Sequence, residues 1–177
     1  MSGKPQNKEK LNRTLEKVCN ILHKEGINDW FIFYGTLLGI VREDSCIEGD
    51  NDLDIVINGE YSVLKALFKE YDFQFYWKGF GRRFKNNKLI LKTQPTDSLS
   101  SVDFYIAEVN HEGSFNVNWV KNKISNCYVD SSKKNFVEKK WKSAILHLPN
   151  DYENKLVSMY GDWKTPGPGR VPRGFDI

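Results

Sequence analysis

Three aspartates at alternate positions are the first side chains in this sequence that could do chemistry. Asp50, Asp52 and Asp54 stand in the run Asp-Asn-Asp-Leu-Asp, which the apolar residues 55–57 continue. Because side chains two residues apart on a strand project from the same face, roughly 6.5–7 Å apart, we expect the three carboxylates to form one row. Each neighbouring pair would repel by about 2–3 kcal/mol at an effective dielectric of about 20. The pattern therefore predicts a cation beside the row.

A divalent metal ion suits these groups. Mg²⁺ binds carboxylate and phosphate oxygens and commonly takes only one or two carboxylates from the protein. Asp103 stands in another strand-like run, Ser-Val-Asp-Phe-Tyr-Ile, and because a buried carboxylate needs a partner, we predict that it lies near the metal. The acids that could bind Mg²⁺, or Mn²⁺ in its place, are Asp50, Asp52, Asp54 and Asp103. The alternative is a solvated acidic turn or a calcium-type loop, for which Asp-Asn-Asp is also suited.

Gly35 and Thr36 offer a site of a second kind, for an anion. They follow the apolar run 30–34, which is typical of a buried strand, and precede a short helical pattern over 37–42. The start of a helix presents free backbone N–H groups and the positive end of the helix dipole, which favour a phosphate. The alternative is that Thr36 only caps the helix. Arg42 ends that helix, where it could complement the helix C-terminus or reach a phosphate.

Hydrophobic periodicity predicts the elements that must position these residues. Apolar residues recur at helical spacing from Leu11 to Leu22 until Gly26 stops the pattern. Further helices are predicted at 37–42, 61–71 and 152–159. Strands are predicted at 30–34, 50–57, 72–77, 82–84, 89–93, 101–109 and 115–120, with a hairpin turn at Asn86-Asn87. Residues 113–142 otherwise lack a regular pattern.

Length and charge place the chain among ordinary single-domain proteins. It has 177 residues, and its net charge of +3 is too balanced for a general nucleic-acid or anionic-membrane binder. No apolar run approaches a membrane span and residues 1–10 lack a signal-peptide core, so we expect a soluble, cytoplasmic protein. We predict one domain over 8–164, between a flexible tail at 1–7 and a Pro/Gly-rich tail at 165–177. Scattered cysteines without metal-ligand spacing predict reduced structural thiols at Cys19, Cys46 and Cys127.

One stretch closely resembles the signature of a known family. Tyr-Gly-Thr-Leu-Leu-Gly-Ile-Val-Arg at 34–42, followed by Ile47 and the acids at 50–54, is similar to the motif of the LicD/fukutin-related family, which belongs to the nucleotidyltransferase-fold superfamily. The resemblance resumes at 101–105, 149–152 and 160–166. It implies an α/β (α+β) fold: a nucleotidyltransferase-like mixed β-sheet flanked by helices, in a single domain.

The resemblance also implies an activity. Members of this family take a phospho-alcohol, such as phosphocholine or phosphoribitol, from a CDP-linked donor and attach it to a hydroxyl of a glycan or glycolipid acceptor, with CMP as the leaving group. Asp52 and Asp54 match the metal-binding pair, and Asp103 matches the third carboxylate, which could also accept the hydroxyl proton. These three are the predicted catalytic residues. Gly35 and Thr36 match the turn that holds the donor phosphates.

Other side chains could hold the nucleotide. The basic candidates could form a cradle on the leaving nucleotide or the charged edge of a solvated hairpin; they are Arg82, Arg83 and Lys85. The aromatic candidates could stack on a base or pack in the core; they are Tyr76, Trp77 and Phe80.

The chain also departs from the family pattern. Glu43 and Glu48-Gly49 stand where the family usually has a basic residue and Pro-Trp, so the loop on the acceptor side differs. Two alternative functions stay open: transfer of a nucleoside monophosphate from an NTP with release of pyrophosphate, and nucleotide binding without catalysis. The Lys-rich stretch 133–142 is interpreted as a solvated face or a contact for an anionic acceptor, and a nucleic-acid partner is not expected.

Overall fold

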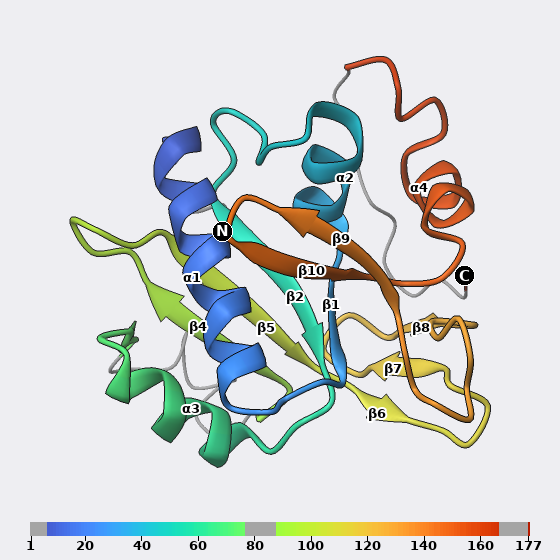
Figure 1. Ribbon diagram of the computed structural model, residues 1–177, viewed down its shortest axis with the longest axis horizontal. Helices are drawn as coiled ribbons and strands as arrows, with labels where there is room; N and C mark the ends of the chain where they lie inside the picture. The colour runs from blue at the N-terminus through green and yellow to red at the C-terminus, as the bar shows by residue number, and fades with distance from the viewer. Residues whose placement is uncertain (1–6, 77–87, 167–176) are drawn as a thin grey trace.

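The computed structural model of the protein describes residues 7–76, 88–166 and 177 (Figure 1). The helices are α1 (Lys8–Lys24), α2 (Tyr34–Glu43), α3 (Tyr61–Glu70) and α4 (Tyr152–Tyr160). The strands are β1 (Trp30–Ile32), β2 (Asp52–Ile57), β3 (Gln74–Phe75), β4 (Ile90–Gln94), β5 (Ser101–Ile106), β6 (Glu108–Val109), β7 (Phe115–Val117), β8 (Asn122–Ile124), β9 (Val137–Trp141) and β10 (Ala144–Leu148). None of the helices within these ranges is long and apolar enough to cross a membrane.

A mixed five-stranded sheet forms the centre, in the order β1-β2-β5-β4-β3. Strands β2 and β5 are parallel, whereas β1 and β4 run antiparallel to their neighbours. The register places Asp54 beside Asp103, and Lys92 of β4 on the other side of Asp103. Residues opposite one another on adjacent strands share a face of the sheet. The predicted mixed sheet flanked by helices is therefore confirmed, and its register gathers charged side chains from three strands.

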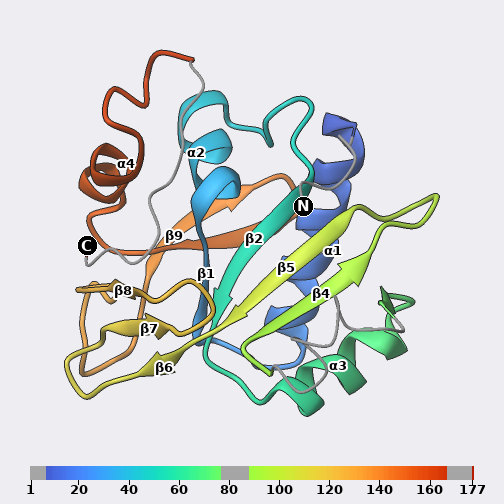
Figure 2. The same ribbon diagram turned by 180° about the vertical axis from the view of Figure 1, so that it is seen from behind.

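Helix α1 and the hairpin β9–β10 cover one face of this sheet (Figures 1 and 2). The helix begins where the Asn7 side chain accepts hydrogen bonds from the backbone N–H groups of Glu9 and Lys10. Its apolar face, predicted from the 11–22 periodicity, is fully buried. In Figure 2 the opposite face of β2, β5 and β4 is turned to the viewer, with α1 behind it. That face carries the charged residues.

Several predicted elements have different bounds. Asp50 precedes β2 instead of lying on it, and the strand predicted at 101–109 is divided into β5 and β6. The β9–β10 hairpin was not predicted, because Glu138, Lys139 and Lys140 make most of β9 charged. The hairpin predicted around Asn86-Asn87 lies largely outside the described residues. Cys19, Cys46 and Cys127 are buried free thiols, as predicted.

Candidate active site

Asp52, Asp54 and Asp103 lie on one face of two adjacent strands. Asp54 and Asp103 are register partners, 9% and 2% exposed, and Asp52 is two residues before Asp54 on the same strand. Burial and then the Asp103 charge raise the pKa of Asp52 to about 7. Burial and the neighbouring carboxylates also raise the pKa of Asp54, and burial raises that of Asp103 against the opposing effect of Lys92. The predicted acids therefore meet, in a setting that disfavours their charged forms.

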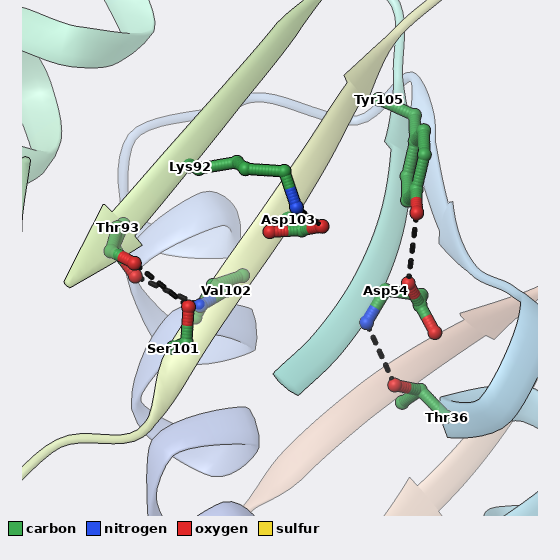
Figure 3. Close-up of polar contacts among 8 residues, drawn as sticks. All are labelled: Thr36, Asp54, Lys92, Thr93, Ser101, Val102, Asp103 and Tyr105. Atoms are coloured by element: carbon green, nitrogen blue, oxygen red, sulfur yellow. Dashed lines mark hydrogen bonds and ion pairs between the residues drawn. The ribbon is translucent and has the colours of Figure 1, made fainter. Parts of the chain in front are cut away.

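The start of α2 holds the Asp54 side chain in place. The Tyr105 hydroxyl donates to Asp54 Oδ1 over 3.2 Å (Figure 3). The backbone N–H of Gly35 donates to Asp54 Oδ2, also over 3.2 Å. A Cβ on Gly35 would lie 2.8 Å from Asp50 Oδ2 and 3.5 Å from Asp54 Oδ2. The glycine thus lets two carboxylates approach the helix N-terminus, which is the anion site predicted from the sequence. In this structure protein carboxylates occupy it, and contact with a donor phosphate stays a prediction.

Thr36 does not cap α2, contrary to the capping alternative. The helix begins at Tyr34 after Phe33 as N-cap, and no side chain caps it. The Thr36 hydroxyl instead accepts a hydrogen bond from the Asp54 backbone N–H over 2.8 Å. The reason lies in the sheet: β1 ends at Ile32, opposite Ile55, so Asp54 has no β1 strand partner for this N–H. Thr36 supplies the missing acceptor and joins α2 to β2.

Lys92 is the counter-charge of Asp103. Its ammonium forms an ion pair with Asp103 Oδ2 (Figure 3), and the Lys92 side chain is 29% exposed. The other oxygen, Oδ1, is buried and has no hydrogen-bond partner among the described residues. Lys92 was not predicted from the sequence, although a lysine directly after the apolar residues Leu89, Ile90 and Leu91 of a predicted strand could have indicated a buried counter-charge. The orphan oxygen is an acceptor that a bound cation would satisfy.

Tyrosines surround the carboxylates. The rings of Tyr34 and Tyr105 meet edge to face with centroids 5.1 Å apart, and the Asn122 amide donates to the Tyr34 hydroxyl over 2.8 Å. Burial and the charges of Asp54 and Asp50 raise the pKa of Tyr160 above its usual range, which places the end of α4 near the same acids. Tyr105 could have been predicted, because it lies two positions after Asp103 on one strand and therefore on the same face. The position of Tyr160 near the acids depends on the tertiary structure and could not be predicted from the sequence.

The carboxylates match a divalent metal in kind. Carboxylate oxygens are ligands that suit Mg²⁺ and Mn²⁺. A cation would relieve the repulsion between the carboxylates and would give Asp103 Oδ1 the partner that it lacks. As the side chains lie here, no group of three His, Cys, Asp or Glu within the described ranges is arranged to hold a metal ion. Lys92 serves as the cation at Asp103 instead. Metal binding therefore stays a prediction.

Comparison with known proteins identifies the family. The sequence profile described as the LicD/FKTN/FKRP nucleotidyltransferase domain matches residues 27–151, which include β1 to β10 and all four of the aspartates discussed. The chain belongs to the LicD/FKTN/FKRP family. The match confirms the resemblance found in the 34–54 motif. No curated protein sequence is significantly similar to the chain.

A solved structure shows the same fold. The crystal structure of the lincosamide antibiotic adenylyltransferase LnuA, bound to lincomycin, superposes with a TM-score of 0.52 at 13% sequence identity. The alignment covers 81% of this chain and 83% of LnuA. At this identity the likeness shows the fold alone. The LicD/FKTN/FKRP domain described here therefore has a nucleotidyltransferase-type architecture.

The remaining predicted contacts of this LicD/FKTN/FKRP domain divide into three groups. Arg42 lies at the last turn of α2 and forms an ion pair with Glu43, whose Oε1 is 2.6 Å from Arg42 Nη2. The acid that departs from the family pattern thus holds the motif arginine. Tyr76 is 39% exposed, so it is not a core residue. The other nucleotide-binding candidates lie outside the described residues: Trp77, Phe80, Arg82, Arg83 and Lys85.

Proposed function

We propose that the chain is a metal-dependent phosphotransferase that moves a phospho-alcohol from a CDP-linked donor to a glycan hydroxyl and releases CMP. Family membership supports a phosphotransferase or nucleotidyltransferase. The observation that carries the proposal is the meeting of Asp52, Asp54 and Asp103 on one face of β2 and β5, where Asp54 and Asp103 are buried, Asp52 is half-buried and the charges repel one another. Such a cluster is costly to fold unless a cation and its anionic ligand complete it.

In this proposal Asp52, Asp54 and Asp103 would hold Mg²⁺ or Mn²⁺, with Asp50 as a further candidate. When bound, the metal would supply positive charge to the donor pyrophosphate and to the oxygens that attack and leave. The residues around it have their own tasks. Gly35 N–H and the Tyr105 hydroxyl keep the Asp54 carboxylate oriented, which preorganises the site. Lys92 brings a second positive charge to the side of β4.

Proton transfer and water exclusion follow from the same geometry. Asp103 would accept the proton of the attacking hydroxyl, since its buried position makes it a stronger base than an exposed aspartate. Asp54 and Asp103 are buried, and the rings of Tyr34 and Tyr105 pack together beside Asp54, so little water reaches these two acids. Less water favours transfer to a sugar hydroxyl over hydrolysis of the donor.

To test this, purified protein is incubated with Mg²⁺ and each of CDP-choline, CDP-ribitol, CDP-glycerol and the four NTPs, and the products are separated by chromatography. We expect CMP from at least one CDP-alcohol. Asp54→Asn should abolish release while the protein stays folded, as judged by circular dichroism. Asp97→Asn, at an exposed position, is the matched control and should release CMP at the wild-type rate. Binding of a nucleotide without any turnover would contradict the proposal and favour a non-catalytic module.

A second candidate is nucleotidyl transfer from an NTP. The observation that favours it is the fold shared with LnuA, which is an adenylyltransferase. The carboxylates on β2 and β5 would serve the same metal chemistry with a triphosphate donor. Pyrophosphate in place of CMP, measured in the same panel, would identify this reaction.

A further inference from the structure

A polar cavity of about 490 Å³ lies between α4 and the loop that follows β8. Amides and hydroxyls form most of its wall, which includes Ser125, Asn126, Asn150, Asn154, Lys155 and Ser158. Such groups donate and accept hydrogen bonds in equal measure, which suits a ligand that is rich in hydroxyls. None of these residues belongs to the carboxylate site described above.

Lys155 is the charged group of this cavity. The residue is only 5% exposed, although lysines are almost never buried without a partner. Among the described residues no hydrogen bond or ion pair involves its ammonium: the acid at the cavity, Asp151, accepts from the Asn154 amide over 2.8 Å instead. Burial lowers the pKa of Lys155, against the opposing effects of Cys127 and Asp151. The side chain of Lys155 is therefore mostly buried while its ammonium reaches the cavity, where an anion would offset the cost of burying the lysine.

The N-terminus of α4 adds a second attraction for an anion. The helix has nine residues, and its N-cap, Asp151, makes no side-chain cap hydrogen bond. The first backbone N–H groups of a helix have no partner within the helix, and the dipole makes this end positive. Lys155 and the helix end therefore both attract an anion, against the opposing charge of the Asp151 carboxylate at the same cavity.

Helix α4 runs from the cavity toward the carboxylates. From Lys155 to Tyr160 the helix advances by about 7.5 Å, at about 1.5 Å per residue. Tyr160 lies close enough to Asp54 and Asp50 for their charges to affect it. A ligand of sugar size held at Lys155 could therefore extend along α4 toward the acids.

We propose that this cavity binds a sugar that carries one anionic group, phosphate or carboxylate, with the Lys155 ammonium on the anion and the asparagine amides on the hydroxyls. The proposal deepens the proposed function and rests on it in one respect: the bound sugar is the acceptor, so the acceptor is an anionic glycan unit. Binding itself does not depend on the carboxylate chemistry.

The experiment measures binding to the full chain by isothermal titration calorimetry in EDTA, without nucleotide. The probes are glucose 6-phosphate for the phosphate source, glucuronate for the carboxylate source, and neutral glucose. We expect one of the charged sugars to bind about tenfold more tightly than glucose, because it gains a charge-assisted hydrogen bond. Lys155→Met should remove this advantage, whereas Lys69→Met, an exposed lysine on α3, should leave it intact.

A second variant tests the cavity even if Lys155→Met fails to fold. Asn154→Ala replaces an exposed residue of the cavity wall, so it should lower the affinity for the charged sugar by about threefold and leave the melting temperature unchanged. Equal affinity for glucose and both charged sugars, or wild-type affinity in folded Lys155→Met, overturns the inference. If charged sugars bind as expected but no CMP is released from any CDP-alcohol, the proposed function fails while the cavity site stands.

Discussion

Replacing Asp52 with asparagine should stabilise the metal-free protein at alkaline pH. Burial and the Asp103 charge raise the pKa of Asp52 from its ordinary value of 3.8 to about 7. Between these values the folded protein binds more protons than the unfolded chain, so its free energy of unfolding falls as the pH rises from about 4 to about 7. Asparagine has the shape of the carboxyl group without the charge and removes this loss.

Two estimates set the size of the effect. The difference in pKa of Asp52 between the unfolded chain and the folded protein corresponds to about 4 kcal/mol. Repulsion by a carboxylate about 6.5–7 Å away contributes about 2–3 kcal/mol at an effective dielectric of about 20. We therefore expect Asp52→Asn to be more stable by about 2–4 kcal/mol at pH 8, which raises the melting temperature by roughly 5–15 °C in a chain of this length. At pH 4 the two proteins should differ little.

The assay is thermal unfolding followed by circular dichroism from pH 4 to pH 8, in EDTA and again in excess MnCl₂. Metal should raise the melting temperature of the wild type most at pH 8, because binding requires the ionised carboxylates. It should raise that of Asp52→Asn far less. Asp97→Asn, an exposed aspartate, is the matched control and should follow the wild type throughout. A stability difference that is independent of pH, or a less stable Asp52→Asn at pH 8, would refute the reasoning.

Three further variants test neighbouring contacts. Thr36→Val keeps the side-chain volume but leaves the Asp54 N–H without its acceptor, so urea unfolding should show a loss of about 1–3 kcal/mol; an unchanged midpoint would contradict the contact. Tyr105→Phe removes a hydrogen bond to Asp54 and should lower kcat for CMP release about tenfold with an unchanged KM, in steady-state kinetics; a rise in KM alone would assign Tyr105 to substrate binding. Lys92→Met leaves Asp103 buried without its cation and should cost about 1–3 kcal/mol at pH 8, less than a fully buried pair because Lys92 is 29% exposed. The cost should shrink as the pH falls, because burial raises the pKa of Asp103 and a protonated carboxyl group needs no cation; denaturant titration at pH 8 and pH 5 checks this.

Local patterns predicted much of the fold. The periodicity over 11–22 placed α1, and the alternation over 50–57 placed β2 to within two residues. The pattern failed for β9, where the exposed side chains are Glu138 and Lys140 and the sequence therefore resembles a charged loop. Its strand character comes from pairing with β10, which follows after residues 142 and 143, and those two residues carry no Gly, Asn or Asp turn signal.

Sequence alone determined which acids could act together on one strand. Two residues of extended backbone carry Asp52 and Asp54 to the same face, because the geometry of a strand is local and covalent. The strand-like run around Asp103 suggested a third carboxylate, and the family motif agreed, but neither indicated its neighbours. These predictions required no knowledge of how the strands are arranged.

Only the tertiary structure decided what surrounds the acids. The parallel pairing of β2 with β5 sets Asp103 beside Asp54, and the antiparallel pairing of β4 sets Lys92 beside Asp103. The fold likewise carries Tyr160 to the acids at the end of α4. Register and strand order arise from the summed packing and hydrogen bonding of distant segments, and a shift of one residue would turn these side chains to opposite faces. Burial by that packing is also what raises the pKa of the carboxylates, a property that three aspartates in an extended, solvated chain would lack.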